Sequence, residues 1–397
     1  MTKLEQLIKE LCPNGVEYKK LSDIATVARG VRVVRDQLAE TGKIPVYQNS
    51  IKPLGYHDKS NVKAYSAFVI GAGAAGEIGF SDLDFWAADD CYYFLCPNNL
   101  NNRYLYYVLM KNQPFILSRV RKASIPRLSR TFIENLIIPV PPIEIQAEIV
   151  KILDNFTELT AELTAELTAR KKQYEYYRDL LLDFGGSRQT DAVHGGGASE
   201  CEWRTLGEIS LSHCSGGTPL KSNHDYYDNG TIPWLRTQEV TFNEITQVDT
   251  YITELAVKET SAKWIPENCV IVAISGASSG RCAINKIPLT TNQHCLNIQI
   301  NPQLALYKYV FYCVVNQYDE LLQKKEGARG DLNSSRIMSL KIPVPPIKEQ
   351  TRIVSILDRF DKLCNDISEG LPAEIEARRK QYEYYRDKLL SFNVREC

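Results

Sequence analysis

Two copies of one helical segment occur in this chain, and this duplication limits the possible fold more than any other feature. The first copy spans 138–184 and the second spans 342–392. Both begin with Ile-Pro-Val-Pro-Pro-Ile, and both contain Gln-Tyr-Glu-Tyr-Tyr-Arg-Asp near their ends. Identity of this extent within one chain indicates a tandem duplication. We therefore expect each half of the 397-residue chain to contain one globular domain followed by one helical segment.

The first copy has the pattern of a long helix in a coiled coil. Its apolar and aromatic residues alternate three and four positions apart over about five heptads, provided that Thr160 and Arg170 fill two gaps. At ~1.5 Å per residue, such a helix would be roughly 60 Å long. Gly185-Gly186 should end it. The predicted seam consists of Ile149, Leu153, Phe156, Leu163, Leu167, Tyr174, Tyr177, Leu181 and Phe184.

The middle of the first copy is a repeated four-residue unit, Thr-Ala-Glu-Leu, between 157 and 169. The second copy has four more residues between the same landmarks, and its Gly370 and Pro372 should bend or break the helix. The region is either a plain structural coiled coil or an adjustable spacer, because units of about one turn change the length without destroying the seam. The leucines of this spacer are Leu159, Leu163 and Leu167.

The rest of the chain can be divided around the two helical segments. The globular segments match weakly at an offset of 204 residues, as in Gly76 with Gly280 and Cys91 with Cys295. The fold therefore repeats while most surface residues differ. We expect a short N-terminal helix with the first globular domain over 1–140, a first spacer helix over 141–184, a flexible Gly/Ser-rich linker over 185–200, a second globular domain over 201–341 and a second spacer helix over 342–397.

The overall composition identifies no partner. The formal net charge is −1, so positive charge must be concentrated locally if the chain binds nucleic acid. The eleven cysteines form no Cys-x-x-Cys pair, and the N-terminus has no signal peptide pattern, so reduced thiols in a cytoplasm are expected. No apolar run approaches ~18 residues, so no membrane span is expected. The five histidines have no metal-ligand spacing, and we predict no metal site.

A glycine-rich stretch at 71–76 raises the question of a nucleotide or methyl-donor site. It has the spacing Gly-x-Gly-x-x-Gly after an apolar run. A dinucleotide site requires a helix next, whereas the residues that follow are strand-like, and the equivalent stretch at 275–280 lacks the pattern. A tight turn in a hairpin over 66–80 explains both copies. Walker A and His-Glu-x-x-His motifs are also missing, so we predict no catalytic residues.

Basic stretches occur at equivalent places in the two halves. The stretch 111–130 contains no acidic residue, and 321–341 is its counterpart. Lysine and arginine hold phosphates, while arginine, asparagine, glutamine and threonine also read base edges. These stretches predict DNA binding. The candidate DNA-binding residues are Arg29, Arg32, Arg35, Arg119, Arg121, Lys122, Arg127, Arg130, Thr218, Lys221, Asn223, Arg236, Gln238, Arg281, Lys324, Lys325 and Arg329.

Over essentially its whole length, the chain resembles the specificity subunits of type I restriction–modification systems. The resemblance is carried by the duplicated Ile-Pro-Val-Pro-Pro-Ile and Gln-Tyr-Glu-Tyr-Tyr-Arg-Asp motifs, the Thr-Ala-Glu-Leu units, and Ser-Gly-Gly-Thr-Pro at 215–219. The first domain has Arg29-Gly30-Val31 where that last motif would lie, and Gly370-Leu371-Pro372 interrupts the second helix.

This resemblance implies a mixed α/β (α+β) fold with two target recognition domains separated by long helices in an antiparallel coiled coil. It implies a non-catalytic subunit that binds a bipartite duplex DNA target. Its implied partners are two methyltransferase subunits and the restriction/translocase subunits of a cytoplasmic complex. The chain itself would bind no cofactor; the partners would use S-adenosylmethionine, ATP and Mg.

Two other classes of function remain open from the residues. The first is a scaffold whose halves bind protein partners, which gel-shift experiments with the methyltransferase subunit on random and selected duplexes would distinguish. The second is an enzyme that uses the glycine-rich loop and a methyl donor. Calorimetry of the isolated chain with S-adenosylmethionine tests this class, and we expect no binding.

Overall fold

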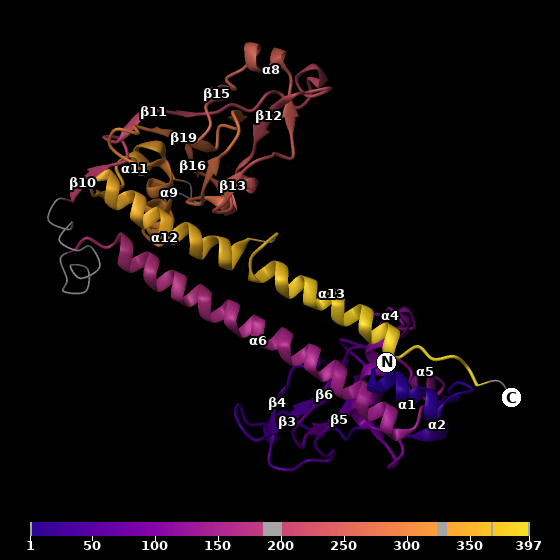
Figure 1. The fold of residues 1–397 in the computed structure, drawn as a ribbon. Coiled ribbons are helices and arrows are strands. Elements are labelled where there is room, and N and C mark those ends of the chain that lie inside the picture. Colours follow the sequence, from indigo (N-terminus) through magenta and orange to yellow (C-terminus); the bar gives the residue numbers. More distant parts are fainter. Residues whose placement is uncertain (1, 186–200, 324–331, 367, 396–397) are drawn as a thin grey trace. The chain divides into compact units, whose positions relative to one another are not determined.

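The computed structural model describes residues 2–185, 201–323, 332–366 and 368–395 (Figure 1). The chain forms two compact units. The first comprises Met1–Ala165 and Ala373–Cys397, and the second comprises Glu166–Pro372. Each unit therefore contains one globular domain and part of both helical segments. The linker expected at 185–200 lies, from residue 186 onward, outside the described residues.

Two β-sheets form the globular part of the first unit. One is antiparallel with the strand order β2-β8-β5-β6, and the other has the order β4-β3-β7, in which β3 and β7 are parallel. Antiparallel pairing of β5 with β6 confirms the hairpin predicted over 66–80. The strands are β2 (Thr26–Arg29), β3 (Ile44–Tyr47), β4 (Gly55–His57), β5 (Ser66–Ile70), β6 (Ile78–Ser81), β7 (Trp86–Ala87) and β8 (Cys91–Leu95).

Short helices cover the antiparallel sheet of the first unit. Helix α3 packs on β5 and β6 and buries Tyr104, Leu105 and Val108. Asn101 caps α3, because its side chain accepts hydrogen bonds from two backbone N–H groups of the first turn. The helices are α1 (Lys3–Leu11), α2 (Leu21–Ile24), the 3-10 turn η1 (Arg35–Gln37), α3 (Asn102–Lys111), α4 (Gln113–Ser118) and α5 (Arg130–Glu134).

The second unit repeats this plan. Its sheets have the orders β11-β19-β16-β17-β13 and β14-β12-β18-β15, so that β11, β19, β16 and β17 correspond to β2, β8, β5 and β6. Strands β12 and β18 are parallel, as are β3 and β7. The strands are β11 (Ser210–Ser215), β12 (Ile232–Leu235), β13 (Glu244–Ile245), β14 (Tyr251–Ile252), β15 (Trp264–Ile265), β16 (Val270–Ala273), β17 (Cys282–Asn285), β18 (Leu289–Thr291) and β19 (Cys295–Ile300).

Helix α9 of the second unit occupies the place of α3 and packs on β16 and β17. The repeated strand order and the repeated helix confirm the duplication of the globular domains. The helices of this domain are η3 (His224–Tyr226), η4 (Thr237–Glu239), α8 (Glu254–Glu259), η5 (Gly276–Ser278), α9 (Tyr307–Asn316), α10 (Tyr318–Gln323) and α11 (Ser334–Met338).

Each globular domain is joined to its helical segment by a short antiparallel ribbon. In the first unit, β1 (Tyr18–Lys20) pairs with β9 (Ile137–Pro139), and in the second, β10 (Glu202–Thr205) pairs with β20 (Lys341–Val344). Each ribbon therefore joins the start of a domain to the strand that directly precedes a long helix.

The helical segments are long, and only the second is interrupted. Helix α6 (Ile143–Leu182) has 40 residues without a break. The second segment consists of α12 (Ile347–Asn365) and α13 (Leu371–Leu389), so the interruption predicted at Gly370 and Pro372 is confirmed. Figure 1 shows α6 in magenta as one continuous helix, and α12 and α13 in orange and yellow as two separate helices.

Aromatic pairs show that the helical segments are antiparallel. In the first unit, the rings of Phe156 and Tyr385 stack at a centroid distance of 5.4 Å. In the second unit, the rings of Tyr177 and Phe360 stack at 5.8 Å. Residue numbers thus rise along α6 while they fall along its partner. Among the seam residues, Ile149, Leu153, Leu181 and Phe184 are buried.

A buried glutamine fixes each long helix to its globular domain. The Gln146 amide donates hydrogen bonds to the carbonyls of Asn99 and Pro141, and its Oε1 accepts one from the N–H of Asn101 at 2.8 Å. Gln350 makes the equivalent three bonds, to Leu304, Pro345 and Leu306. The glutamine of each helical copy therefore joins the loop before α3 or α9 to the proline-rich helix start.

Candidate nucleic-acid interface

The glycine-rich stretch of the first domain is the turn between β5 and β6. Gly73 and Gly76 have φ values of +85° and +87°, a region that side-chain-bearing residues rarely adopt. A Cβ at Gly71 would lie 2.8 Å from the Tyr92 ring, and one at Gly76 would lie 2.9 Å from Leu117 in α4. Because a strand and not a helix follows, the turn has the wrong structure for a dinucleotide site. The turn is close-packed against α4 and the segment after it, and we call residues 71–76 the glycine turn.

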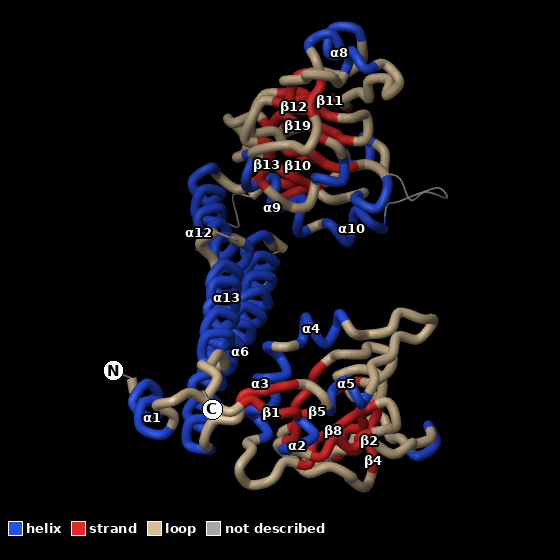
Figure 2. The backbone as a smooth tube through the Cα atoms, turned by 90° about the vertical axis from the view of Figure 1, so that its right-hand side faces the viewer, coloured by secondary structure: helices blue, strands red, loops and turns tan. Residues whose placement is uncertain are grey.

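A basic hairpin packs on this glycine turn. The backbones of Arg121 and Arg127 pair through two hydrogen bonds of 2.8 and 3.1 Å. Gly73 N–H donates to the Pro126 carbonyl at 3.1 Å, and Leu128 N–H donates to the Gly71 carbonyl at 2.8 Å. We call residues 121–127 the basic hairpin. Figure 2 shows α4, which leads into it, at the edge of the first domain.

The predicted basic residues around this hairpin have different surroundings. Arg121, Lys122 and Arg127 are exposed on the hairpin, and the exposed Arg119 lies 5.1 Å from the centre of the Phe115 ring. Arg130 forms an ion pair with Glu134 at 3.1 Å, which partly neutralises the charge of Arg130. The structure thus brings Arg119, Arg121, Lys122 and Arg127 together.

Other predicted residues of the first domain lie at the end of β2 and in the loop after it. Arg29 and Arg32 are exposed, and the Nε of Arg29 donates to the Asp89 carbonyl at 2.6 Å. The side chain of Arg35 lies outside the described part of the chain. Gly30 and Gly216 occupy equivalent positions, since a Cβ at either would collide with the backbone at the end of β7 or β18. Arg29-Gly30-Val31 therefore corresponds to the start of the Gly-Gly-Thr-Pro stretch.

In the second domain, the predicted residues that the structure describes follow β11 or β12 in the chain, except Arg281, which directly precedes β17. Thr218 donates a hydrogen bond to Gln293, and the exposed Gln238 lies in η4, which contacts η5. Arg236 is partly buried beside Glu239, and Arg281 is partly exposed. Lys221 is exposed, whereas the Asn223 side chain caps η3. Lys324, Lys325 and Arg329 lie outside the described residues.

Sequence reasoning missed a pair of residues on this surface, Gln293 and His294. Both are exposed in the turn before β19, and their side chains contact each other at 3.2 Å. The N–H of Asn292 donates to the Leu235 carbonyl, which places this turn beside the end of β12. The 204-residue offset relates this pair to Asp89 and Asp90. That offset was the signal that could have pointed to both turns.

The spacer leucines lie on the uninterrupted part of α6. Leu163 and Leu167 are half-buried, while Leu159 is 36% exposed. The hydroxyls of Thr157 and Thr160 donate hydrogen bonds to the backbone carbonyls one turn earlier. These threonine hydroxyls therefore find acceptors within the helix itself. The spacer therefore needs no partner side chain at its polar positions.

The two copies of Gln-Tyr-Glu-Tyr-Tyr-Arg-Asp place their tyrosines alike. Tyr174 and Tyr382 are half-buried, and Tyr177 and Tyr385 stack on phenylalanines of the facing helix. The remaining tyrosine of each copy, Tyr176 or Tyr384, is about 60% exposed, at 58% and 62%. Each unit thus presents the same exposed aromatic side chain on its helix surface.

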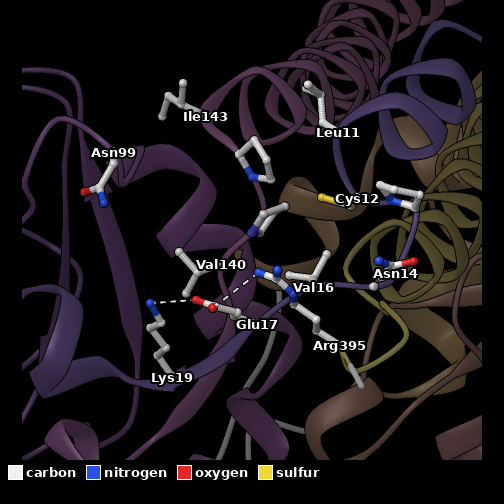
Figure 3. A pocket seen from close by; sticks show the side chains of 14 residues that line it. Leu11, Cys12, Asn14, Val16, Glu17, Lys19, Asn99, Val140, Ile143 and Arg395 are labelled. Carbon is white, nitrogen blue, oxygen red and sulfur yellow. Dashed lines mark ion pairs between the residues drawn. The ribbon is translucent and has the colours of Figure 1, made fainter. Parts of the chain in front are cut away.

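A pocket in the first unit lies where the chain ends meet. Val16 pairs with Val394 in a parallel bridge, and the cavity beside it has a volume of about 490 Å³. Its lining includes Cys12 and the prolines before α6. Figure 3 shows Glu17 between Lys19 and Arg395, with ion pairs of 2.7 and 3.6 Å. The charged groups of this pocket neutralise one another, so the pocket is a joint between chain segments.

Three buried cysteines are poorly suited to nucleophilic catalysis. Burial raises the pKa of the Cys91, Cys282 and Cys313 thiols, which disfavours the nucleophilic thiolate. No group of three or more potential metal ligands occurs in the ranges that the structure describes. Within the same ranges, no helix is both long and apolar enough to cross a membrane.

Comparison with known proteins relates the whole chain to one family. The family model described as "Type I restriction modification DNA specificity domain" matches residues 13–170 and 198–377. The specificity subunit of the type I restriction enzyme EcoR124I/EcoR124II from Escherichia coli is 44% identical over 260 residues, covering 64% of this chain and 61% of that protein. A putative type I restriction enzyme specificity subunit from Haemophilus influenzae is 31% identical over 411 residues, covering 99% of both chains.

Solved structures show the same fold at low sequence identity. The S subunit of the type I restriction–modification system from M. genitalium matches with a TM-score of 0.66 and 16% identity, covering 95% of this chain and 96% of that one. A chain from a structural study of type I R-M complex assembly matches with a TM-score of 0.63 and 14% identity, covering 95% and 98%. The mixed α/β architecture with paired long helices is therefore shared.

Proposed function

The chain belongs to the type I restriction–modification DNA specificity family, and we propose that its two globular domains bind the two parts of a split duplex DNA target. In this proposal the chain directs a partner methyltransferase and the restriction machinery to that target. The chain is the non-catalytic specificity subunit of such a complex. Its recognition domains would be 1–140 and 201–341, its spacer helices 141–184 and 342–397, and its linker 185–200.

One observation carries this proposal: the two domains share a strand order but differ in the polar residues at equivalent loop positions. The turn before β8 has Asp89 and Asp90, whereas the turn before β19 has Gln293 and His294. Carboxylates accept hydrogen bonds from cytosine, whereas glutamine pairs with adenine. Two copies of one scaffold with different hydrogen-bonding groups are what reading two different sequences requires.

The exposed basic side chains would hold the DNA in place. Arg119, Arg121, Lys122 and Arg127 form one group in the first domain. Such contacts fix the position of a protein on duplex DNA without specifying the bases. With a formal net charge of −1, the chain would bind DNA weakly alone, and the partner subunits would complete the interface.

Two methyltransferase subunits would bind the two equivalent helix surfaces. Tyr176 and Tyr384 present the same exposed ring within identical motifs, and exposed aromatic rings are frequent anchors of protein interfaces. Restriction/translocase subunits would join this assembly in the cytoplasm. The chemistry would belong to these partners, which would use S-adenosylmethionine, ATP and Mg.

Selection of DNA by the assembled complex tests the proposed function. The chain with its cognate methyltransferase subunit is mixed with random duplexes, and the bound duplexes are sequenced after repeated selection. We expect two defined base sequences separated by a constant number of undefined base pairs. Enrichment of one continuous sequence, or no enrichment at all, would contradict the proposal.

A combined Arg121→Ala, Lys122→Ala and Arg127→Ala variant tests the basic residues separately. Loss of each phosphate contact should weaken binding to every sequence and reduce the slope of log K against log[salt] by about one unit. Unchanged affinity and an unchanged slope would remove these residues from the interface. Lys63→Ala is a matched control, because Lys63 is exposed but pairs with Asp84 at 3.2 Å.

A further inference from the structure

The basic hairpin also carries an exposed apolar side chain, which phosphate binding does not explain. Ile125 is 53% exposed near the tip of the hairpin, and Lys122, Ala123 and Ser124 beside it are exposed as well. Single exposed apolar residues are common on protein surfaces. The position of Ile125 on a fixed basic hairpin distinguishes it from such residues.

The hairpin is held firmly although its tip is exposed. Two backbone hydrogen bonds attach Pro126 and Leu128 to the glycine turn, and two more pair Arg127 with Arg121. The Tyr92 hydroxyl also donates to the Leu128 carbonyl at 3.1 Å. The glycines of the turn permit this close approach, because a Cβ at Gly73 would lie 2.8 Å from the backbone of Asn49. Ile125 is thus presented on a pre-organised element, which lowers the entropic cost of binding.

The charge around the tip selects a negatively charged partner. Residues 111–130 include six basic side chains and no acidic one. Among the described residues, the nearby ion pair is that of Arg130 with Glu134, and none is formed by Arg121, Lys122 or Arg127. An apolar tip between cations that have no carboxylate partner fits a surface with phosphates on both sides and apolar atoms between them. The major groove of duplex DNA is such a surface.

The size of the element also favours that groove. A major groove about 12 Å wide admits a two-stranded ribbon, and its base edges carry one apolar group, the thymine 5-methyl. We propose that the basic hairpin enters the major groove of the first part of the target and that Ile125 contacts a thymine methyl group there. Arg121 and Arg127 then reach the phosphates on either side. This assignment rests on the proposed function, in which the first domain reads one part of a split site.

Uracil in place of thymine tests this contact, because uracil lacks only the methyl group. The native chain with its methyltransferase subunit is bound to duplexes in which each thymine of the selected target is replaced singly. Loss of one buried methyl corresponds to about a fourfold loss of affinity, given ~0.8 kcal/mol for burying such a group. We expect this loss at one position of the first part, on whichever strand carries the contacted thymine.

The same series with Ile125→Ala forms a double-mutant cycle. The variant should bind the thymine duplex more weakly and should no longer distinguish it from the uracil duplex at that position. Leu83→Ala is the matched control, since Leu83 is 59% exposed in the same domain but stands between Asp82 and Asp84. This control should keep the full uracil penalty.

The possible outcomes separate the two proposals. Absence of any uracil penalty in the first part, or a penalty that persists in Ile125→Ala, overturns the assignment of Ile125 while leaving split-site recognition intact. Failure of the proposed function would appear earlier, as the absence of a selected split target for the native complex. Uracil in the second part provides an internal reference, because its effects should be identical in the native chain and in Ile125→Ala.

Discussion

Individual side chains connect the duplicated motifs to the fold. Gln146 and Gln350 are both buried completely, and each makes three hydrogen bonds to backbone groups. A glutamine suits this position because its amide offers both donors and an acceptor. Glutamate would lack the donors for the two carbonyls.

Replacing Gln146 by alanine should therefore destabilise the first unit. Two carbonyls and one N–H would lose their partner, and unsatisfied buried polar groups cost ~1–3 kcal/mol each, so a total loss of at least about 3 kcal/mol is expected. Urea unfolding followed by circular dichroism measures this loss. Gln6→Ala is the control, because Gln6 bonds only with the exposed Glu10 on the surface of α1. A Gln146→Ala midpoint equal to that of the control would contradict this role.

Two aspartates of the second helical segment should influence stability in opposite directions. Burial raises the pKa of Asp361, and the nearby Asp358 raises it further, while Asn365 and Lys308 oppose the shift and Glu244 adds to it. Hydrogen bonds from Ser368 and from the N–H of Glu369 lower the pKa of Asp366. A charged Asp361 is thus unfavourable in the folded state, and a charged Asp366 is favourable.

At neutral pH, Asp361→Asn should raise the melting temperature and Asp366→Asn should lower it. The gain in Asp361→Asn should shrink as the pH falls through the raised folded pKa, because the native carboxyl then takes up a proton and loses its penalty. The loss in Asp366→Asn should shrink only as the pH falls through the depressed folded pKa of Asp366. Thermal unfolding between pH 3 and pH 8 follows both, and shifts of the same sign would contradict the assignment.

At the scale of elements, the sequence predicts those helices and turns that have a local or periodic sequence pattern. The heptad pattern predicted α6, Gly370 predicted the break after α12, and the small-residue turn predicted the β5–β6 hairpin. The parallel pairing of β3 with β7 was not predictable, because it joins short strands far apart in the chain. Gln293 and His294 were also not predicted, since exposed turn residues follow no periodicity. The duplication alone relates them to Asp89 and Asp90.

The repeated unit in α6 predicts how the two parts of the DNA target are spaced. One more Thr-Ala-Glu-Leu unit after Leu167 lengthens the helix by ~6 Å and rotates its end by only about 40°. B-DNA rises ~3.4 Å per base pair. We expect the gap between the two parts to lengthen by one or two base pairs, and one is the better match to the rotation. Methylation mapping of the insertion variant measures the gap.

This insertion should leave the two recognised sequences themselves unchanged. A control insertion of the same four residues between Asp58 and Lys59, in the exposed loop after β4, should not alter the gap. The spacer assignment fails if the gap stays fixed, or if the recognised bases change while the domains remain folded.

At the scale of the whole molecule, the first unit is completed by the second helical copy. Tyr382, Leu390 and Phe392 pack against the core of the first domain, although they follow it by more than 200 residues in the chain. The equivalent residues of the first copy are Tyr174, Leu182 and Phe184. The end of one copy can therefore take the place of the end of the other.

A chain that ends at Phe184 should form a symmetric dimer. Each copy would supply the end of α6 that completes the first domain of its partner, which is the isologous arrangement of a twofold dimer. With methyltransferase subunits, the dimer should modify a palindromic target built from the first part of the natural one. Light scattering and methylation mapping check this result. A strictly monomeric, inactive product would count against the interchangeability of the two halves.

Methylation mapping of domain-specific variants tests whether each domain reads its own part of a split target. A host carrying the complete system is compared with hosts carrying Gln238→Ala or the combined alanine variant of the basic hairpin. We expect a split methylated sequence in which Gln238→Ala relaxes bases of the second part alone, by about 1–3 kcal/mol of discrimination. The hairpin variant should weaken modification at all targets without altering the second part. A continuous methylated sequence, or relaxation of both parts by Gln238→Ala, would contradict the assignment of one part of the target to each domain.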